Sequence, residues 1–285
     1  MLRRSTIQLL RFHFSLFLLP VYLFALSQAN EINWRNAVLS FIILHLLVYP
    51  ASNGYNSYMD RDETPIGGLA SPLQPTKQLF YATVAMDVLA VMLSLCISPL
   101  FAGGVLLYIL ASRAYSYRGI RLKKYPVIGF LTVFIFQGAL VFFISYEAVN
   151  AQGEKNPGWI PLLLSSLLIG ALYPLTQIYQ HEEDKKDGVT TISCLLGKRG
   201  TFVFSMTLFL LASLLMYFLF KEKGRLNHFT LFLFYLLPVV LFFLYWMNRV
   251  WKDGSTANFK NSLRMNLLST LCTAAYFITL IILNH

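Results

Sequence analysis

The sequence predicts an all-α membrane protein, a bundle of nine transmembrane helices. The chain has 285 residues, of which 56% are hydrophobic and only 13% are charged. Apolar runs long enough to cross ~30 Å of hydrocarbon recur along its whole length. A soluble domain can bury a large core, but it does not require one such run after another. The composition and the recurring runs therefore favour an integral membrane protein.

Each expected helix corresponds to its own apolar window. The windows cover residues 8–28, 36–58, 77–97, 99–115, 126–147, 159–180, 201–220, 228–248 and 265–283. The third and fourth windows nearly touch, and we place their boundary at Ser98 and Pro99. The sequence shows no soluble domain, tandem repeat or low-complexity tract, so residues 1–285 are expected to form one membrane domain.

Basic residues are distributed unequally between the two sides of this bundle. If the N-terminus is cytoplasmic, 18 of the 23 lysines and arginines fall on that side and five on the other. Such an excess marks the cytoplasmic side of a membrane protein. We therefore expect a cytoplasmic N-terminus and an external C-terminus, in the inner (plasma) membrane of the cell. The loop that carries Lys221, Lys223 and Arg225 departs from this pattern.

The formal net charge of +10 is explained in the same way. Basic residues of a membrane protein first report its topology and its contact with anionic lipid of the inner leaflet. We therefore expect the lipid bilayer, and no nucleic acid, among the partners of this chain.

The N-terminal segment also allows a different interpretation. Arg3 and Arg4, the apolar stretch after them and residues 27–29 together resemble a cleavable signal peptide. Arg11 interrupts that pattern, and the apolar run is long enough to span the membrane. These two features favour a first transmembrane helix, with cleavage as the alternative.

Two acidic stretches end helices on the same predicted side of the membrane. "NGYNSYMDRDETPIGG" follows the second span, and "YQHEEDKKDG" follows the sixth. In the first stretch Asn56 and Asp60 are four residues apart, as are Gln180 and Asp184 in the second, so each pair shares one face of its helix end. Pro65 disfavours helical geometry at the residue before it, which ends the first helix just after its carboxylates.

Carboxylate and amide oxygens are hard ligands that hold Mg²⁺ when substrate phosphates fill the remaining positions. Two such clusters that face each other could bind one or two Mg²⁺ ions and, through these ions, a diphosphate. Acidic and basic residues at helix ends can also simply mark the membrane boundary. The presence of both clusters on one side of the same bundle favours a binding site.

A basic segment on the same side suits a diphosphate as well. "SRAYSYRGIRLKK" carries Arg118, Lys123 and Lys124 among its bases, and Lys185 lies within the second acidic stretch. Arg and Lys can both neutralise a pyrophosphate leaving group, with different geometries. Most charges of this segment are equally explained as topology-setting residues in contact with anionic lipid.

Asp87 is an ionisable residue near the middle of the third span, and such a residue is by default a functional hypothesis. It could act as a base on the acceptor side of a reaction, or as a paired or neutral carboxylate that holds helices together. His45 and Gln137, in the second and fifth spans, are better explained as interhelical hydrogen-bond partners.

Taken together, these residues resemble the UbiA-type intramembrane aromatic prenyltransferases. That family consists of nine-helix bundles with two aspartate-rich motifs that bind Mg²⁺ and a prenyl diphosphate. Asn56 and Asp60 match the first two positions of motif one, and Asp184 matches the last position of motif two. The residue pattern that follows motif two in the family is also matched here, by Lys185, Gly188, Thr191 and Gly197. The stretch "YSYRGIRLKK" is similar to a Tyr-Ser and Lys/Arg segment of the family.

The sequence also departs from the pattern of the family. The last aspartate of motif one falls on Thr64, the first aspartate of motif two falls on Gln180, and a frequent Arg-Pro is Ser71-Pro72. Thr and Gln offer neutral oxygens, so two negative charges are missing and Mg²⁺ affinity is expected to fall unless neighbours compensate. The neighbouring acids are Asp62, Glu63, Glu182 and Glu183.

The resemblance implies transfer of a prenyl chain from a prenyl diphosphate to a lipophilic acceptor, such as an aromatic compound or a quinone precursor. Asp60 and Asp184 would be the catalytic residues, and Mg²⁺ the cofactor. The missing aspartates motivate an alternative: a UbiA-like protein that binds or transports a lipid or isoprenoid without catalysis. A third possibility is an enzyme of changed chemistry at the same diphosphate site.

Overall fold

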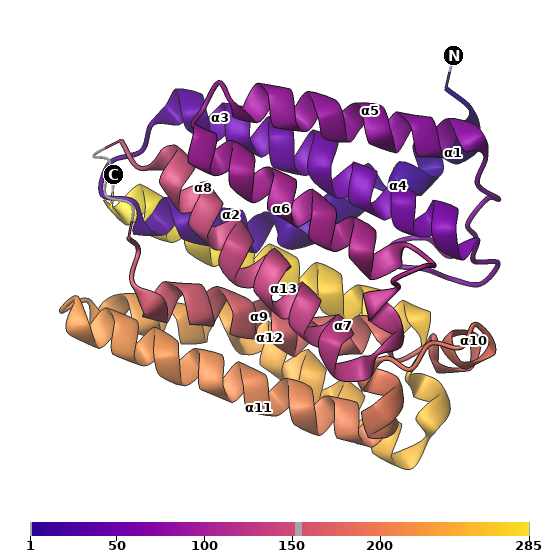
Figure 1. Ribbon diagram of the computed structural model, residues 1–285. Coiled ribbons are helices and arrows are strands. Elements are labelled where there is room, and N and C mark those ends of the chain that lie inside the picture. The colour runs from indigo at the N-terminus through magenta and orange to yellow at the C-terminus, as the bar shows by residue number, and fades with distance from the viewer. Residues whose placement is uncertain (1, 152–155, 285) are drawn as a thin grey trace.

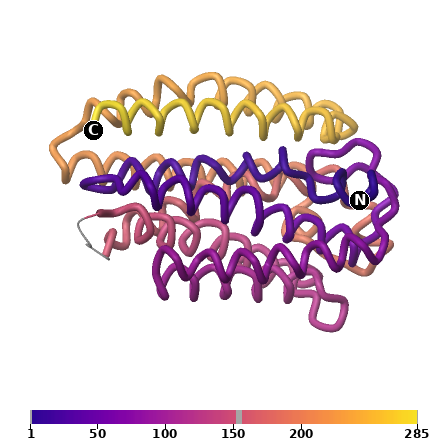
Figure 2. Tube along the Cα trace, turned by 90° about the horizontal axis from the view of Figure 1, so that it is seen from above, coloured from indigo at the N-terminus to yellow at the C-terminus, as the bar shows by residue number. Residues whose placement is uncertain are grey.

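The computed structural model describes residues 2–151 and 156–284, and every regular element of those ranges is a helix. Lys155, which is one of the five bases expected on the external side, lies outside the described residues. The helices lie side by side in one long bundle (Figure 1). The N-terminus lies at one end of this bundle and the C-terminus at the other, in both views (Figure 2). The predicted all-helical membrane bundle is confirmed.

Several spans consist of more than one helix. The first contains α1 (Arg4–Leu10), η1 (Phe12–Leu18) and α2 (Leu19–Gln28), and the second contains α3 (Trp34–Phe41), η2 (Ile42–Val48) and α4 (Tyr49–Asp60). They are followed by α5 (Lys77–Ser94) and α6 (Pro99–Ser116), and by the short η3 (Leu122–Lys124). The next span contains α7 (Pro126–Val133), η4 (Phe134–Leu140) and α8 (Val141–Val149). The chain continues with α9 (Trp159–Gln177), α10 (His181–Lys186), α11 (Ile192–Glu222), α12 (Leu226–Lys252), η5 (Gly254–Thr256) and α13 (Phe259–Asn284).

Among the described residues, eight of these helical units are long and apolar enough to cross a membrane. α6 has 18 residues and occupies the place of the predicted fourth span. It begins at Pro99, and the Ser98 hydroxyl accepts a hydrogen bond of 3.0 Å from the Phe101 backbone N–H at its first turn. A proline at the start of a helix and a serine before it are both favourable there.

Some helices extend well beyond their apolar windows. α11 begins at Ile192, where the Thr191 hydroxyl accepts a hydrogen bond of 3.3 Å from the Cys194 N–H. Gly197 then bends this helix with φ of 67°, a left-handed conformation that glycine adopts without steric cost. The apolar window instead begins at residue 201, because hydropathy detects the hydrocarbon-facing part of a helix and not its aqueous end.

The first span packs against the last. α2 contacts both α8 and α13, and the Phe24 ring lies 4.7 Å from Phe142 and 4.9 Å from Phe277, measured between centroids. All three side chains are fully buried. The segment that resembles a signal peptide is therefore part of the core of this bundle.

One end of the bundle, here called the loop end, carries residues 61–76, 117–125 and 178–191. Helical geometry is interrupted near it. Arg11, between α1 and η1, and Arg61, at the end of α4, both have left-handed φ values, of 47° and 56°. Such conformations are uncommon for residues other than glycine. At Arg11 the break turns the side chain inward, where its guanidinium donates hydrogen bonds of 3.1 Å to the carbonyl oxygens of Gly67 and Asn53.

Candidate functional site

Side chains from both acidic stretches line one cavity of about 250 Å³ at the loop end, here called the polar cavity. Its charged and amide residues are Arg11, Asn53, Asn56, Asp60, Asp62, Lys123, Gln137, Gln177, Gln180, Asp184 and Asn266. α4 supplies the first acidic stretch and α9 with α10 supplies the second. The packing of these helices thus brings together the two pairs that the sequence singles out.

Asp60 lies at the centre of the polar contacts. It ends α4, and its side chain is only 4% exposed. Its Oδ2 accepts hydrogen bonds of 2.8 Å from the Asn56 amide and 2.5 Å from the Lys123 ammonium. Its Oδ1 is buried and accepts no hydrogen bond from any residue in the described ranges, although the Arg121 guanidinium lies 3.6 Å away. A buried carboxylate oxygen of this kind is available to a further cation.

The carboxylates of the cavity affect one another's protonation. The pKa of Asp184 is raised to about 7, chiefly by burial; the Lys123 ammonium opposes this rise, and Asp62 and Asp60 add to it. The pKa of Asp62 is raised to about 6, again chiefly by burial and then by the Asp60 charge. Three acids that share one partly desolvated space repel one another as anions. A bound cation would relieve that repulsion.

Contacts between the loops fix this arrangement. The Gln180 amide donates a hydrogen bond of 3.3 Å to the Pro65 carbonyl oxygen, which joins the second acidic stretch to the first. Arg121 forms an ion pair with Asp187, and Arg118 lies 3.5 Å from the same carboxylate. Burial alone would raise the pKa of Asp187, but the Arg121 guanidinium more than offsets this, and the pKa is lowered.

Other predicted site residues lie elsewhere. Glu63 is exposed, and Glu183 forms an ion pair of 2.7 Å with Lys186 on the surface. Thr64 lies outside the described residues that line the polar cavity. Of the acids proposed above to replace the missing charges, the structure therefore brings Asp62 to the cavity.

The predicted basic residues are divided in a similar way. Lys123 lines the cavity. Lys124 is exposed with its ammonium 4.8 Å from the ring centroid of Tyr125, and Lys185 is also exposed. Arg118 is exposed and donates to the Met59 carbonyl oxygen at 2.8 Å.

Asp87 is paired within the bundle. It forms an ion pair with Arg113 of α6, whose guanidinium also lies 3.8 Å from the ring centroid of Tyr55. Asp87 is outside the described residues that line the polar cavity. Its contacts link α5 to α6, as expected for a charged residue that must find a partner at membrane depth.

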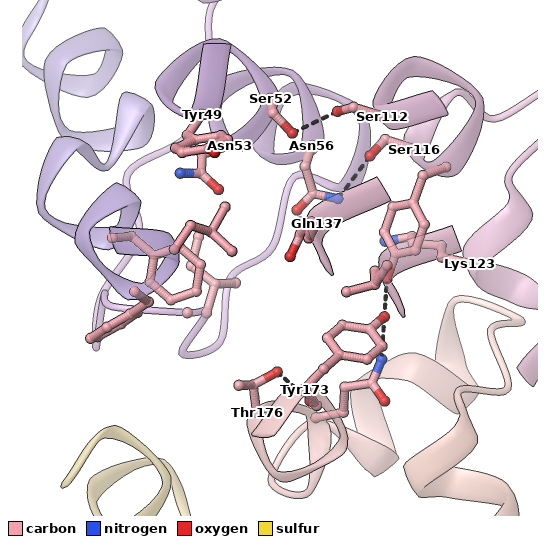
Figure 3. Close-up of a pocket in the computed structure, with 18 of the residues that line it drawn as sticks. Tyr49, Ser52, Asn53, Asn56, Ser112, Ser116, Lys123, Gln137, Tyr173 and Thr176 are labelled. Atoms are coloured by element: carbon pink, nitrogen blue, oxygen red, sulfur yellow. Dashed lines mark hydrogen bonds between the residues drawn. The ribbon is translucent and has the colours of Figure 1, made fainter. Parts of the chain in front are cut away.

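Several residues of the cavity are not predicted from the sequence. Figure 3 shows Asn56 with Ser116 on one wall and Tyr173 on the facing wall. The Tyr173 hydroxyl accepts a hydrogen bond of 2.7 Å from the Gln177 amide and also bonds to the Tyr115 hydroxyl. Tyrosine and glutamine inside spans carry little signal, because both residue types also pack between helices.

Arg11 is a cavity residue that could have been identified from the sequence, because it interrupts an otherwise apolar run. We expect Arg11→Met to lower the free energy of unfolding by about 2–3 kcal/mol, since hydrogen bonds from a charged group contribute roughly 1.5–3 kcal/mol each. The side chain is only 5% exposed, so the Gly67 and Asn53 carbonyl oxygens would lose their partner away from bulk water. Thermal unfolding in detergent measures the effect. Arg4→Met, at an exposed position of α1, is the matched control, and equal unfolding midpoints for the two variants would contradict the role of Arg11.

The protein ligands of this cavity are incomplete as a metal site. Within residues 2–151 and 156–284, no group of three or more His, Cys, Asp or Glu side chains is arranged so that it could hold a metal ion. Carboxylate and amide oxygens are the ligand types that a hard divalent cation accepts when a phosphate-bearing molecule supplies its remaining ligands.

Solved structures with the same fold are known. A UbiA homologue from Archaeoglobus fulgidus, bound to GPP and Mg²⁺, is similar with a TM-score of 0.72 and 19% identity, over 97% of this chain and 99% of the homologue. A UbiA homologue from Aeropyrum pernix K1, in its apo form, has a TM-score of 0.69 and 19% identity, over 94% and 98% of the two chains. A structure of digeranylgeranylglyceryl phosphate synthase has a TM-score of 0.61 and 20% identity, over 98% and 97%. These TM-scores show that the chain shares its fold with these proteins.

Sequence comparison assigns the family. No curated protein has a significantly similar sequence. The model of the UbiA prenyltransferase family, however, matches residues 16–270, which include both acidic stretches. The chain therefore belongs to the UbiA prenyltransferase family.

Proposed function

We propose that this protein transfers a prenyl chain from a prenyl diphosphate to a lipophilic acceptor within the membrane, with Mg²⁺ as cofactor. One observation carries the proposal: Asp60 and Asp184, more than a hundred residues apart, line the same cavity with the Lys123 ammonium. An Archaeoglobus fulgidus homologue with this fold has been solved with GPP and Mg²⁺, and another structure of it holds DMAPP and Mg²⁺.

The residues of the polar cavity fit Mg²⁺. The buried Asp60 Oδ1 accepts no hydrogen bond from the described part of the chain. Asp62 and Asp184 line the same cavity, so a cation there would offset the repulsion among the three carboxylates. Asp60 and Asp184 would hold the ion, with Asn56, Asp62 and Gln180 as further oxygen ligands. When bound, Mg²⁺ neutralises negative charge on the departing diphosphate.

Side chains of the protein would neutralise the diphosphate and stabilise the allylic cation. The Lys123 ammonium lines the cavity beside Asp60 and can neutralise a diphosphate oxygen as charge develops on it. Tyr49, Tyr108, Tyr115 and Tyr173 line the part of the cavity within the bundle. Aromatic faces attract a positive centre, and an enclosed apolar wall keeps water from an allylic cation.

The same arrangement supports our proposals for the acceptor and for the membrane orientation. A polar cavity that continues into the bundle suits a ring-containing acceptor such as an aromatic compound or a quinone precursor. We place the loop end and the N-terminus in the cytoplasm, the C-terminus outside, and the whole chain as one domain in the inner membrane. This orientation presents the cavity to the charged donor.

Pyrophosphate release tests the proposal. The purified protein would be incubated with Mg²⁺, a panel of prenyl diphosphates and lipophilic acceptors, and compared with the same mixture after chelation by EDTA. We expect release with at least one donor, and loss of release after chelation. Donor binding without turnover would support the non-catalytic alternative, and absence of both would exclude the proposal.

Lys123 and Lys124 are adjacent bases with different expected roles. Lys123→Ala should raise KM for the donor about tenfold or more, because a charge-assisted hydrogen bond is worth roughly 1.5–3 kcal/mol. Lys124→Ala should leave KM near the wild-type value, because Lys124 is exposed beside Tyr125. Steady-state kinetics against donor concentration distinguishes them, and equal effects of the two substitutions would contradict this assignment.

A further inference from the structure

The polar cavity is lined by buried polar atoms that form no hydrogen bond with the described part of the chain. These atoms are Arg11 Nε, the Tyr49 hydroxyl, Asp60 Oδ1 and Gln177 Oε1. Asp60 Oδ1 belongs to the proposed metal site, and the two terminal nitrogens of Arg11 already donate to backbone carbonyl oxygens. The proposed function assigns nothing to the Tyr49 hydroxyl or to Gln177 Oε1. Because a buried polar group without a partner is uncommon and costly, these two atoms require an explanation.

The two atoms belong to facing walls of the cavity. Tyr49 begins α4 and Gln177 ends α9, and their side chains are only 1% and 6% exposed. In Figure 3, Tyr49 and Ser52 lie on one wall, and Thr176, which precedes Gln177 in α9, lies on the facing wall. The Gln177 amide nitrogen is held by the Tyr173 hydroxyl, which leaves the amide oxygen as its free polar atom. A ligand that fills the space between the walls would meet both unpartnered atoms.

Tyr49 lies far inward of the carboxylates. It is the first of the 12 residues of α4 and Asp60 is the last, so they are about 16 Å apart along the helix axis. The Tyr108 ring lies 5.7 Å from the Tyr49 ring, measured between centroids, and the Tyr108 hydroxyl interacts with the side chains of Ser52 and Gln137. Tyr49, Ser52, Tyr108 and Gln137 are here called the inner end. A diphosphate held at Asp60 does not reach the inner end, which is therefore available to a second substrate.

The inner end offers hydroxyl and amide groups and no charge. Among the described residues, the cations that line the polar cavity are Arg11 and Lys123, and both already have partners. A carboxylate buried at the inner end would lack a counter-charge, which is strongly unfavourable. A hydrocarbon chain would leave the hydroxyl and amide groups unsatisfied. The ligand that suits this end is uncharged and carries oxygen atoms.

Two π-helical turns lie beside the inner end. η2 directly precedes Tyr49, and η4 contains Gln137. The turn of η4 is held by Ser166, whose hydroxyl accepts a hydrogen bond of 3.0 Å from the Ala139 N–H. A Cβ atom at Gly138 would lie 2.4 Å from the Ser166 Cα, so the close approach requires glycine. Turns of this kind are frequent at functional sites, because the extra residue changes the direction of the side chains around it.

The geometry points to the inner end, with Gln177, as the binding site of the acceptor, and to an uncharged ring with two hydroxyl groups, such as a hydroquinone, as its chemical class. One ring oxygen accepts a hydrogen bond from the Tyr49 hydroxyl, and a ring hydroxyl donates to Gln177 Oε1. Hydroxyl groups also donate electron density to the ring, which makes its carbon atoms nucleophilic toward an allylic cation. This inference rests on the proposed function, because it names the acceptor of that reaction.

Two ring compounds test the charge of the acceptor. Methylhydroquinone and gentisate carry the same two hydroxyl groups, and gentisate has a carboxylate in place of the methyl group. Dissociation constants would be measured by titration calorimetry of the detergent-solubilised protein under reducing conditions, with Mg²⁺ and a non-hydrolysable thio analogue of geranyl diphosphate present. We expect methylhydroquinone to bind at least about tenfold more tightly, because the carboxylate of gentisate would be buried without a counter-charge.

Tyr49→Phe tests the hydroxyl contact. It removes an atom that has no partner within the described residues, so the unfolding midpoint should not fall. The affinity for methylhydroquinone should fall about fivefold, the scale of one neutral hydrogen bond. Tyr22→Phe is the matched control, because Tyr22 is also buried, lies outside the described lining of the cavity, and donates to the Ala37 carbonyl oxygen at 2.5 Å. It should lower the unfolding midpoint and leave the affinity unchanged.

The opposite results are equally specific. Equal or tighter binding of gentisate would overturn the assignment of an uncharged acceptor, and unchanged affinity of Tyr49→Phe for methylhydroquinone would overturn the proposed site. If Tyr49→Phe fails to fold, Gln177→Met tests the contact on the facing wall with the same two compounds. Failure of methylhydroquinone to bind a protein that binds the thio analogue would overturn this inference alone. Failure of the thio analogue to bind would instead reject the proposed function.

Discussion

Replacement of Asp60 by Asn should lower kcat/KM for pyrophosphate release by about 10²–10³-fold, the effect of removing one electrostatic contact from an active site. The Asp60 carboxylate lies in contact with Lys123 and close to Arg121, and its side chain is almost completely buried. Asparagine preserves the shape of this side chain but removes the charge that the bases and a divalent cation both require. Steady-state kinetics at saturating Mg²⁺ measures the loss.

Asp253→Asn is the matched control for this substitution. Asp253 follows α12 and accepts a hydrogen bond of 2.9 Å from the Ser255 backbone N–H, outside the described residues of the polar cavity. It should keep wild-type kinetics. Thermal unfolding of both variants separates lost chemistry from lost folding. An Asp60→Asn protein that folds normally and retains wild-type kinetics would show that the site lies elsewhere.

Gln180→Glu should lower the Mg²⁺ concentration needed for half-maximal activity by roughly tenfold, the lower end of the effects that neighbours of a metal site have on its affinity. Gln180 lines the polar cavity together with Asp62 and Asp184. Glutamate has nearly the same shape and restores a negative charge where the family pattern expects aspartate. Activity measured against Mg²⁺ concentration gives the shift directly.

Thr64→Glu provides the comparison, because Thr64 is the other position where the family pattern expects aspartate. It lies outside the described residues of the polar cavity, so an added carboxylate there should change the Mg²⁺ requirement little. A larger shift for Thr64→Glu than for Gln180→Glu would mean that the first loop rearranges when the metal binds.

The fold could be predicted from the sequence to a large extent, and the reason is physical. Each span must bury its backbone polar groups within a helix and present apolar side chains to lipid, so the hydropathy of one segment is sufficient to identify it. The segment from 192 to 200 escaped prediction because its helix depends on the Thr191 cap and on the bend at Gly197. Neither feature changes the local hydropathy.

The candidate site could be predicted only in part. Spacing along a helix places Asn56 beside Asp60, and the direct hydrogen bond between their side chains agrees with it. The choice between Asp62 and Glu63, or between Lys123 and Lys124, depends on a single peptide unit in a connection between the long helices. There the direction of each side chain is decided by contacts such as the Arg121–Asp187 ion pair.

The sequence by itself therefore determined the membrane class, the helical bundle and the two helix ends that carry the candidate site. These properties depend on residues close together in the chain and on the cost of exposing polar groups to hydrocarbon. Only the tertiary structure decided that Arg11 enters the polar cavity, that Asp62 joins Asp60 and Asp184, and that Tyr49 and Gln177 line the same space. Those properties arise where segments distant in sequence pack together, and no local pattern encodes the space that is left between them.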